Sequence, residues 1–417
     1  MEYKVKTLND LTNIIQEDKI LSYNEISFDE NFDYDEMIGF LLKNQNDVRY
    51  ICFLGFCFLK IANVEKGISQ YQKAAKLKYS RAQCELGMCY FYGNYGISQD
   101  LKEAVKYFKL AASKGEPRAQ YHLGMFYEEG VIVGKKPAKA VKYYKLSAEK
   151  GIVEAQMAVA DCYRDGKGVA QNYEEAIKYY KILAEKGNLE AQNNLGNFYH
   201  SGKGVEKNCE QAFKYYKLAA DQGDLMGILN VANCYYYGDG IEKNYDDAVK
   251  YFKLAAEKGH PYAQYKLGVC YSDGKGVEKN YEEAVKYYKL AADQGNADAQ
   301  NNLANLYYEG EGVEKNCEEA FKYYKQAASQ GHILGLCGLA NCYFYGDGTA
   351  QNYEVAAKFY KLAADQGHPY AQNRLALCFY KGDGVKKNIK EAIKYLKMAA
   401  QQGDAESIQI LKVIEKN

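Results

Sequence analysis

The residue types that most often carry catalysis are few in this chain and fall at regular positions. Only five histidines occur among 417 residues, and His260, His332 and His368 each directly follow a glycine that recurs at a fixed interval. This regularity is typical of a helix start and not of a metal ligand or a general base. The chain has no HExxH, GxSxG or phosphate-binding loop motif. The sequence therefore predicts a non-enzymatic protein without a catalytic, cofactor or metal site.

The twelve cysteines could bind zinc or form disulfides, but their spacing favours neither. Pairs such as Cys52 and Cys57 lie five residues apart, which on a helix turns the two side chains about 140° away from each other. Zinc sites require C-x-x-C or Cys/His spacing, and the chain has none. Six cysteines share one repeat position: Cys89, Cys162, Cys234, Cys270, Cys342 and Cys378. We interpret them as small buried hydrophobic residues in a reducing compartment, so a cytoplasmic location is expected.

Five Lys-Tyr-Tyr-Lys runs, such as Lys178 to Lys181, combine charge and rings as nucleic-acid-binding surfaces do. However, the chain has 54 basic and 54 acidic residues, a formal net charge of zero. Glu174 stands four residues before Lys178, a spacing that favours an ion pair on a solvated helix face. No nucleic-acid partner is therefore expected. No run of about 18 apolar residues and no apolar leader segment occurs, so neither a transmembrane segment nor a secretory signal is expected.

An internal repeat in the sequence indicates which helices position the residues described above. Glycines recur every 36 residues from Gly115 to Gly403, which defines eight consecutive units without insertion or deletion. A 37-residue unit covers 82–119, and a shorter degenerate unit covers about 49–80. A half unit follows at 404–417.

The first half of each unit predicts a helix, here called helix A. In the unit that starts at Gly187, Ala191, Leu195, Gly196 and Tyr199 are spaced as one face of a helix. The residue after the leucine is always Gly or Ala, which allows neighbouring helices to approach closely. The four prolines fall where a helix tolerates them, at the start of helix A or helix B: Pro117, Pro137, Pro261 and Pro369.

The second half of each unit predicts helix B, which an Asn begins and a Gly ends. Asn172 is a preferred N-cap, because its side chain accepts an otherwise unpaired backbone N–H. The predicted buried residues of this helix are Ala176, Tyr180, Leu183 and Ala184. Gly187 is expected in the left-handed conformation that ends helices.

These positions closely resemble the Sel-one-like repeat family, a branch of the tetratricopeptide-like α/α solenoids. The matching residues in one unit are Ala191, Leu195, Gly196, Tyr199, Gly202, Gly204, Val205, Ala212, Tyr216, Ala220 and Gly223. Seven strict GxG loops occur, and the loops at 93–96 and 130–134 depart from the pattern. The resemblance implies an all-α fold, a right-handed superhelix of about ten 36-residue helix-turn-helix repeats.

The resemblance also implies a function and a surface for it. Relatives act in endoplasmic-reticulum degradation complexes, in the activation of chitin synthase and in bacterial signalling. We therefore expect a protein-protein interaction scaffold or adaptor that binds a protein or an extended peptide in a concave groove lined by helix A. The alternative is a regulatory subunit that activates a membrane-associated enzyme, as a chitin-synthase activator does. The oligomeric state stays open.

Two polar positions of helix A vary between units and lie three residues apart, away from the predicted Leu/Tyr core. Asn is frequent at both, and its amide can both donate to and accept from a peptide backbone. The predicted groove residues are Asn194, Asn197, Asn230, Asn233, Lys266, Asn302, Asn305, Asn341 and Arg374. Lys266 and Arg374 would select a carboxylate. An equally good interpretation is that these side chains are ordinary solvent-exposed polar residues of a helix and have no binding role.

Residues 1–46 lack the repeat. Leu8, Leu11, Ile14 and Ile15 suggest one short helix, and the apolar residues from Met37 to Leu42 suggest another. Between them, 25–36 is acidic, without Lys or Arg. We expect a capping or docking segment at 1–46 ahead of a repeat solenoid at 47–417, with 404–417 as its C-terminal cap.

Overall fold

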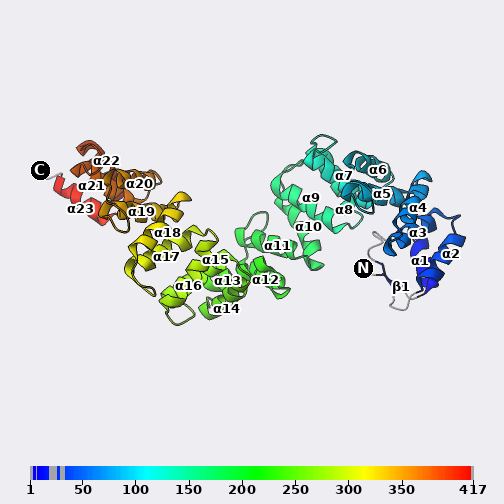
Figure 1. Cartoon of the computed structure of the whole chain (residues 1–417), viewed down its shortest axis with the longest axis horizontal. Coiled ribbons are helices and arrows are strands. Elements are labelled where there is room, and N and C mark those ends of the chain that lie inside the picture. The colour runs from blue at the N-terminus through cyan, green and yellow to red at the C-terminus, as the bar shows by residue number, and fades with distance from the viewer. Residues whose placement is uncertain (1–2, 6, 18–25, 29–32, 415–417) are drawn as a thin grey trace. The chain divides into compact units, whose positions relative to one another are not determined.

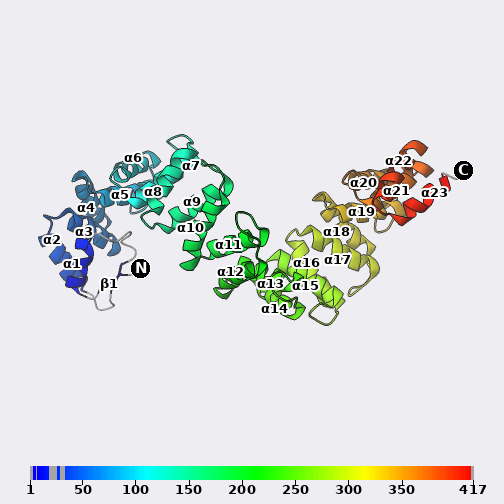
Figure 2. The same ribbon diagram turned by 180° about the vertical axis from the view of Figure 1, so that it is seen from behind.

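The computed structural model describes residues 3–5, 7–17, 26–28 and 33–414. These residues form 23 α-helices and two short β-strands (Figures 1 and 2). The chain divides into two compact units, Met1–Asn208 and Cys209–Asn417. Each unit is a stack of antiparallel helix pairs, so the fold is the predicted all-α solenoid.

The helices of the first unit alternate between helix A, with odd numbers from α3 to α11, and helix B, with even numbers. Their bounds are α1 Leu8–Glu17, α2 Tyr34–Lys43, α3 Val48–Lys60, α4 Val64–Lys76, α5 Ser80–Tyr92, α6 Leu101–Ala112, α7 Pro117–Glu129, α8 Pro137–Ala148, α9 Val153–Asp165, α10 Tyr173–Glu185 and α11 Leu189–Ser201. The two strands are β1 Tyr3–Val5 and β2 Ile26–Phe28.

The second unit begins with a helix B and continues the alternation. Its helices are α12 Cys209–Asp221, α13 Leu225–Tyr237, α14 Tyr245–Glu257, α15 Pro261–Asp273, α16 Tyr281–Asp293, α17 Ala297–Glu309, α18 Cys317–Ser329, α19 Ile333–Tyr345, α20 Tyr353–Asp365, α21 Pro369–Lys381, α22 Ile389–Gln401 and α23 Ala405–Ile414. Nine of the ten expected pairs lie within a unit and pack together, while α11 and α12 belong to different units.

The ends of helix B are set by the residues that the sequence indicated. The Asn172 side chain accepts the Glu175 N–H at 3.0 Å and begins α10. At the other end, Gly187 has φ +85°, and its N–H donates to the Ala184 carbonyl at 3.0 Å. The N–H of Asn188 reaches the Leu183 carbonyl, which completes a two-bond C-terminal cap. All four prolines stand in the first turn of a helix.

In most repeats an aromatic ring of helix B, usually that of a tyrosine, packs on a small residue of helix A. A Cβ added to Gly268 would lie 2.4 Å from the Tyr288 ring, and one added to Gly124 would lie 2.6 Å from the Tyr144 ring. Ten of the twelve cysteines are buried, and all twelve are free thiols. The small-residue and cysteine predictions for the core are confirmed.

In most repeats a buried glutamine on helix A bonds to the preceding repeat, which the sequence analysis missed. Gln300 donates to the Ala292 carbonyl at the end of the preceding helix B, at 3.1 Å. Gln192 and Gln372 make the equivalent bonds in their repeats. The side chain adds a second hydrogen bond to a carbonyl at the helix end that also accepts the N–H of the closing glycine.

The second glycine of each GxG loop lets the loop touch the previous helix B. Gly276 has φ +70°, and an added Cβ would lie 2.2 Å from the Tyr245 carbonyl oxygen. In the two divergent loops, Tyr95 and Ile132 adopt positive φ without being glycine.

The N-terminal helices appear where the sequence predicted them, but a small parallel strand pair accompanies them. Tyr3 pairs with Ile26 and Val5 with Phe28. Two three-residue strands far apart in sequence show no alternating pattern, which is why they were missed. Residues 25 and 29–32 of the acidic stretch at 25–36 lie outside the described residues.

Candidate binding groove

The described residues contain no group of three His, Cys, Asp or Glu side chains that could hold a metal ion. Four of the five histidines lie at helix starts or in the core. His260, His332 and His368 are helix N-cap residues, as predicted. His122 is 8% exposed, and burial lowers its pKa to about 4.

Two surface hollows open where predicted groove residues stand. The Asn194 hollow has a volume of about 770 Å³ and is lined by Arg164, Asp165, Gln171, Tyr173, Asn194, Asn197, Phe198, His200, Ser201 and Lys203. The Asn302 hollow has a volume of about 600 Å³ and is lined by Ser272, Asp273, Lys275, Lys279, Tyr281, Tyr288, Asn302, Asn305, Leu306 and Glu311. Nearly all lining positions of the two hollows are equivalent, because most lie 108 residues, or three repeats, apart. One hollow lies in each unit of the chain.

The asparagines of these positions also serve the core, contrary to the expectation that they face away from it. The hydroxyl of the buried Tyr324 donates to the Asn305 side chain at 2.5 Å. The Tyr360 hydroxyl donates to Asn341 at 2.6 Å. A buried hydroxyl needs an acceptor, so these amides are partly committed to the fold.

Asn302 also forms a hydrogen bond with the hydroxyl of a core tyrosine, here as the donor. Its amide donates to the Tyr288 hydroxyl at 3.3 Å, and Ser272 lies 3.2 Å from that hydroxyl. Asn302 is half-buried, whereas Asn305 and Asn197 are exposed. The amide groups therefore form part of the floor and wall of the hollow.

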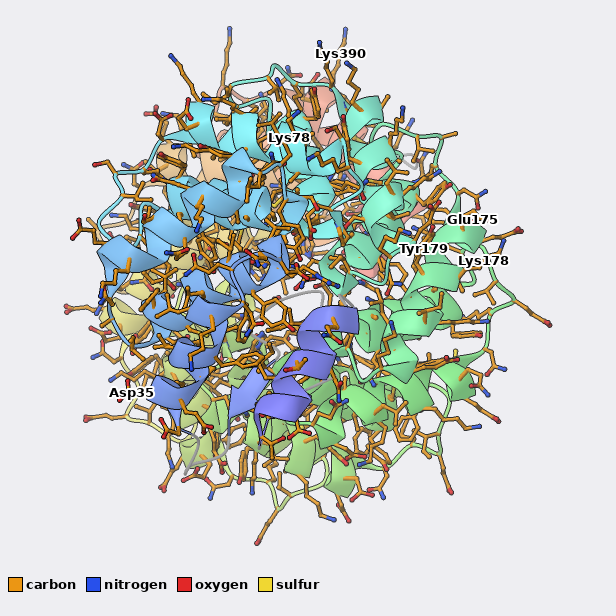
Figure 3. The ribbon with its side chains drawn as sticks, turned by 90° about the vertical axis from the view of Figure 1, so that its right-hand side faces the viewer. Asp35, Lys78, Glu175, Lys178, Tyr179 and Lys390 are labelled. Atoms are coloured by element: carbon orange, nitrogen blue, oxygen red, sulfur yellow. The ribbon has the colours of Figure 1, made fainter. Side chains whose placement is uncertain are left out.

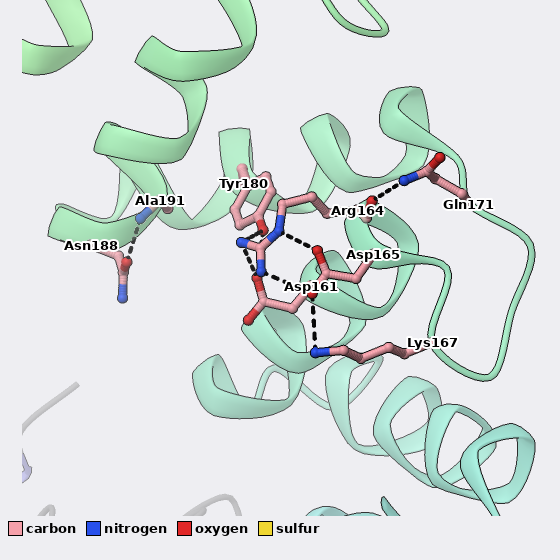
Figure 4. Close-up of polar contacts among 8 residues, drawn as sticks. All are labelled: Asp161, Arg164, Asp165, Lys167, Gln171, Tyr180, Asn188 and Ala191. Atoms are coloured by element: carbon pink, nitrogen blue, oxygen red, sulfur yellow. Dashed lines mark hydrogen bonds and ion pairs between the residues drawn. The ribbon is translucent and has the colours of Figure 1, made fainter. Parts of the chain in front are cut away.

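In the first unit, ion-paired side chains occupy the position that an asparagine amide holds in the second unit. Tyr180 donates to Asp161 at 2.6 Å, and Arg164 lies 2.8 Å from both Asp161 and Asp165 (Figure 4). Burial, followed by the bond to Asp161, raises the pKa of Tyr180. The hydroxyl therefore stays protonated and donates to the carboxylate.

Lys266 is not free to select a carboxylate, which corrects the prediction for this residue. It is 8% exposed, and its Nζ lies 4.8 Å from the Tyr236 ring centroid and 5.1 Å from that of Tyr237. The ammonium donates to the Tyr237 hydroxyl at 2.7 Å, and two more rings lie within 6 Å, those of Tyr262 and Tyr265. Cation–π attraction stabilises the charge in this cage.

Arg374 occupies the equivalent place three repeats later. Its guanidinium lies 5.4 Å from the Phe344 ring centroid and 5.9 Å from that of Tyr345. It donates to the Tyr345 hydroxyl at 2.6 Å. Unlike Lys266, it is only partly buried.

The remaining predicted residues lie on α13. Asn233 accepts the Tyr262 hydroxyl at 3.1 Å, and Asn230 stands one turn earlier, half-buried. The structure thus brings Asn194 with Asn197, and Asn302 with Asn305, into open hollows. It commits Lys266, Asn233 and Asn341 to contacts with tyrosines.

The sequence analysis missed the groove residues that come from the loops and the helix B starts. Tyr281 and Glu311 line the Asn302 hollow, and Tyr173 and Lys203 hold the same positions in the Asn194 hollow. The signal was present, since position 311 varies in charge between repeats while position 281 is usually aromatic.

The lysines of the basic-aromatic runs lie on the opposite, solvated side of helix B. Lys178 pairs with Glu175 at 2.5 Å and not with the predicted Glu174, and both side chains lie close together in Figure 3. Lys286 and Lys322 make the same pair three residues apart. Lys178, Lys286 and Lys322 are thus charge-compensated.

Comparison with known sequences shows what the repeats are similar to. A family model described as the Sel1 repeat matches nine consecutive segments between residues 80 and 404, well over half of the chain. The segments are 80–116, 117–152, 153–188, 189–224, 226–260, 261–296, 297–332, 333–368 and 369–404. An F-box protein of Arabidopsis thaliana is 32% identical over 79 residues. That match spans 19% of this chain and 22% of the plant protein's length.

Two solved structures share the fold over most of their length. One is a protective antigen of uropathogenic Escherichia coli strains that displays an SLR fold; it is 29% identical, with a TM-score of 0.64, over 93% of this chain and 91% of its own. The other is a Sel1 repeat protein from Oxalobacter formigenes, 30% identical with a TM-score of 0.61, over 74% of this chain and 89% of its own.

Proposed function

Since the chain belongs to the Sel1 repeat family, with nine repeats between residues 80 and 404, we propose that it is a non-enzymatic scaffold or adaptor that binds a protein or an extended peptide along helix A. Repeats of this kind typically mediate protein binding. The observation that carries the proposal is the pair of open hollows at equivalent repeat positions, one in each unit.

The chemistry of the hollows supports a peptide ligand. Each presents an Asn amide, a tyrosine ring and charged rim residues within one hollow. An amide pairs with peptide N–H and C=O groups regardless of sequence, and a ring offers an apolar surface for a side chain.

The experiment is a binding screen with groove and control variants. The full chain is applied to an array of immobilised extended peptides, and bound peptides are then titrated in solution. We expect Asn194→Ala with Asn302→Ala to weaken binding about tenfold or more, because each lost amide contact costs about 1 kcal/mol. The control, Lys178→Ala with Lys322→Ala, alters only exposed helix B residues and should leave the affinity within about twofold. Loss of binding in the control alone would place the site on the opposite surface.

We also propose that residues 1–46 cap the first repeat of a solenoid that occupies 47–417. Leu11, Met37 and Leu41 are fully buried in a cluster with α3 residues that include Phe53. Arg49 of α3 donates to the Gln16 carbonyl at 2.8 Å. These contacts support a cap that covers the open face of α3. At the other end, Asn373 donates to the buried Ser407 at 2.9 Å, which supports 404–417 as the C-terminal cap.

A cytoplasmic, reducing location is part of the same proposal. The buried thiols support it, because burial raises the pKa of cysteines such as Cys270 and Cys378, each to about 11. We expect thiol titration of the natively isolated, denatured and unreduced chain to find close to all twelve thiols. Six or more missing thiols would contradict this. Among the described residues, no helix is both long enough and apolar enough to span a membrane.

A further inference from the structure

One repeat position of helix A holds a cation against aromatic rings in two repeats of the second unit. Lys266 lies over Tyr236 and Tyr237, and Arg374 lies over Phe344 and Tyr345. In both cases the rings belong to the last residues of the preceding helix A. The fold therefore has a place for a cation that each of these repeats fills with its own side chain.

Asn302 stands at the same repeat position, 36 residues after Lys266 and 72 before Arg374. Its short side chain leaves the Asn302 hollow open, with a volume of about 600 Å³. The two ring positions that precede it carry Ser272 and Asp273, so the hollow is widened and a carboxylate stands at its edge. Two lysines, Lys275 and Lys279, line this hollow, but neither stands at the repeat position that Lys266 and Arg374 hold.

The charge on the loop is also reversed at this repeat. Lys275 of the preceding loop lies 5.9 Å from the Tyr236 ring centroid and 6.0 Å from that of Tyr245. Its equivalent one repeat later is Glu311, which lines the Asn302 hollow beside Tyr281. In the Arg374 repeat the same position is Asp383, beside Tyr353. The Asn302 hollow thus has the acid and the aromatic residue of the Arg374 repeat without the arginine.

The nearby lysines make their closest contacts elsewhere, although the charges of Lys279 and Glu311 also attract each other. Lys275 pairs with Asp273 at 2.9 Å, and Lys279 lies 4.6 Å from the Tyr281 ring centroid. Within the described part of the chain, no basic nitrogen lies within the 4.0 Å of an ion pair with Glu311. A carboxylate on the rim of a hollow, next to a ring, attracts a cation from outside.

We propose that the Asn302 hollow binds the Arg or Lys side chain of a partner polypeptide, with Glu311 and Tyr281 receiving its charge and Asn302 and Asp273 accepting its N–H groups. This inference rests on the proposed function and names the side-chain class that one hollow selects. The Asn194 hollow has the opposite character, since Arg164 and Lys203 occupy the positions of Ser272 and Glu311.

The test uses two blocked tripeptides of equal shape, acetyl-Gly-Arg-Gly-amide and acetyl-Gly-citrulline-Gly-amide. Their affinities for the full chain are measured by ligand-observed NMR titration. We expect the arginine peptide to bind about tenfold more tightly than the uncharged citrulline peptide, and its binding to weaken with added salt. Asn302→Arg, which supplies an internal cation as Arg374 does, and Glu311→Gln should each weaken binding about tenfold.

Lys178→Ala, on the solvated side of helix B and outside both hollows, is the control variant and should leave arginine-peptide binding unchanged. Circular dichroism checks that all variants stay folded; Glu311→Gln, on an exposed loop, keeps the test independent of the packing around Asn302. Equal binding of both peptides, still blocked by Asn302→Arg, would overturn the cation selectivity while the groove function stands. Binding that Asn302→Arg leaves unchanged, or no saturable binding up to about 10 mM, would overturn the site itself.

Discussion

The polar residues of this groove have two roles, because the hydroxyls of core tyrosines end at the surface where a ligand would bind. Tyr324 is 7% exposed, and its hydroxyl is bonded to Asn305. Removal of the acceptor leaves a buried donor unpaired, whereas removal of both partners does not. Groove variants must therefore be interpreted together with their effect on stability.

At the residue scale, we predict that Asn305→Ala lowers the free energy of unfolding by about 1–3 kcal/mol. The double variant Asn305→Ala with Tyr324→Phe should lose less than the sum of the two single variants, because the unpaired hydroxyl is gone. Urea unfolding followed by circular dichroism measures both effects. If the double variant lost as much unfolding free energy as the two single variants together, the 2.5 Å contact would contribute nothing in solution.

A second residue-scale prediction concerns the pH dependence of stability. His122 packs its ring on Phe108, with centroids 5.0 Å apart, and among the described residues its Nδ1 has no hydrogen-bond partner. Burial, followed by the charge of Arg118, lowers its pKa from 6.5 to about 4. The unfolded chain therefore binds one more proton than the folded chain between these pH values. The contribution of His122 is fully present above pH 6.5, and up to about 3 kcal/mol is lost as the pH falls to about 4.

The check is urea unfolding of the parent chain and of His122→Phe at several pH values. The variant keeps an aromatic ring against Phe108 and removes the titrating group. We expect the loss of stability between pH 6.5 and 4 to be smaller in the variant. Identical slopes would show that His122 is not buried in its neutral form.

At the element scale, the loops decide how closely successive repeats approach. Gly276 and Gly259 both have positive φ, but only Gly276 faces a neighbour, the carbonyl oxygen of Tyr245. An alanine at Gly259 would meet only the intrinsic cost of the left-handed conformation, about 1–2 kcal/mol. Comparing alanine at Gly259 with alanine at Gly276 therefore distinguishes the cost of backbone strain from the cost of lost packing between repeats.

We predict that Gly276→Ala destabilises the chain by about 1–3 kcal/mol more than Gly259→Ala, because the added methyl group forces the loop away from α14. Thermal unfolding followed by circular dichroism compares the two variants directly. Equal losses would mean that the loop contact is not needed for stacking. The same displacement would also disturb the Asn302 hollow, since Lys275 and Lys279 flank this loop.

At the scale of the whole molecule, the exposed end of a repeat stack needs a cover. Val5, Leu11, Met37 and Leu41 are fully buried at the N-terminal end, in one cluster with residues of α3. Nearest-neighbour stacking makes the loss of such a cover a local event with limited spread. Repeats far from α3 should therefore remain folded without it.

We predict that removal of residues 1–46 lowers the unfolding midpoint and increases binding of a hydrophobic dye, because α3 loses its apolar cover. Each buried side chain removed contributes about 1.5–3 kcal/mol. A variant truncated after Gly331 should lose stability without a comparable gain in dye binding per chain if the repeats are equivalent. An unchanged midpoint after removal of 1–46 would favour a docking segment over a cap.

The sequence alone determined the repeat, the helix pairs and their ends, because these depend on local chemistry. An Asn before helix B caps it through its own side chain, and a Gly after it adopts positive φ, as Asn172 and Gly187 do. The small residue beneath each tyrosine could also be read from the pattern, since its position is constant in every repeat. The strands β1 and β2 could not, because their pairing is long-range and only three residues long.

Only the tertiary structure decided which groove residues are free to act. Lys266 and Asn302 hold the same sequence position, yet one is enclosed by four tyrosines and the other lines an open hollow. The difference comes from residues of the preceding repeat, Tyr236 and Tyr237 in one case and Ser272 and Asp273 in the other. Periodicity shows which side of a helix a residue occupies, but the neighbouring helix decides whether its charge is already satisfied.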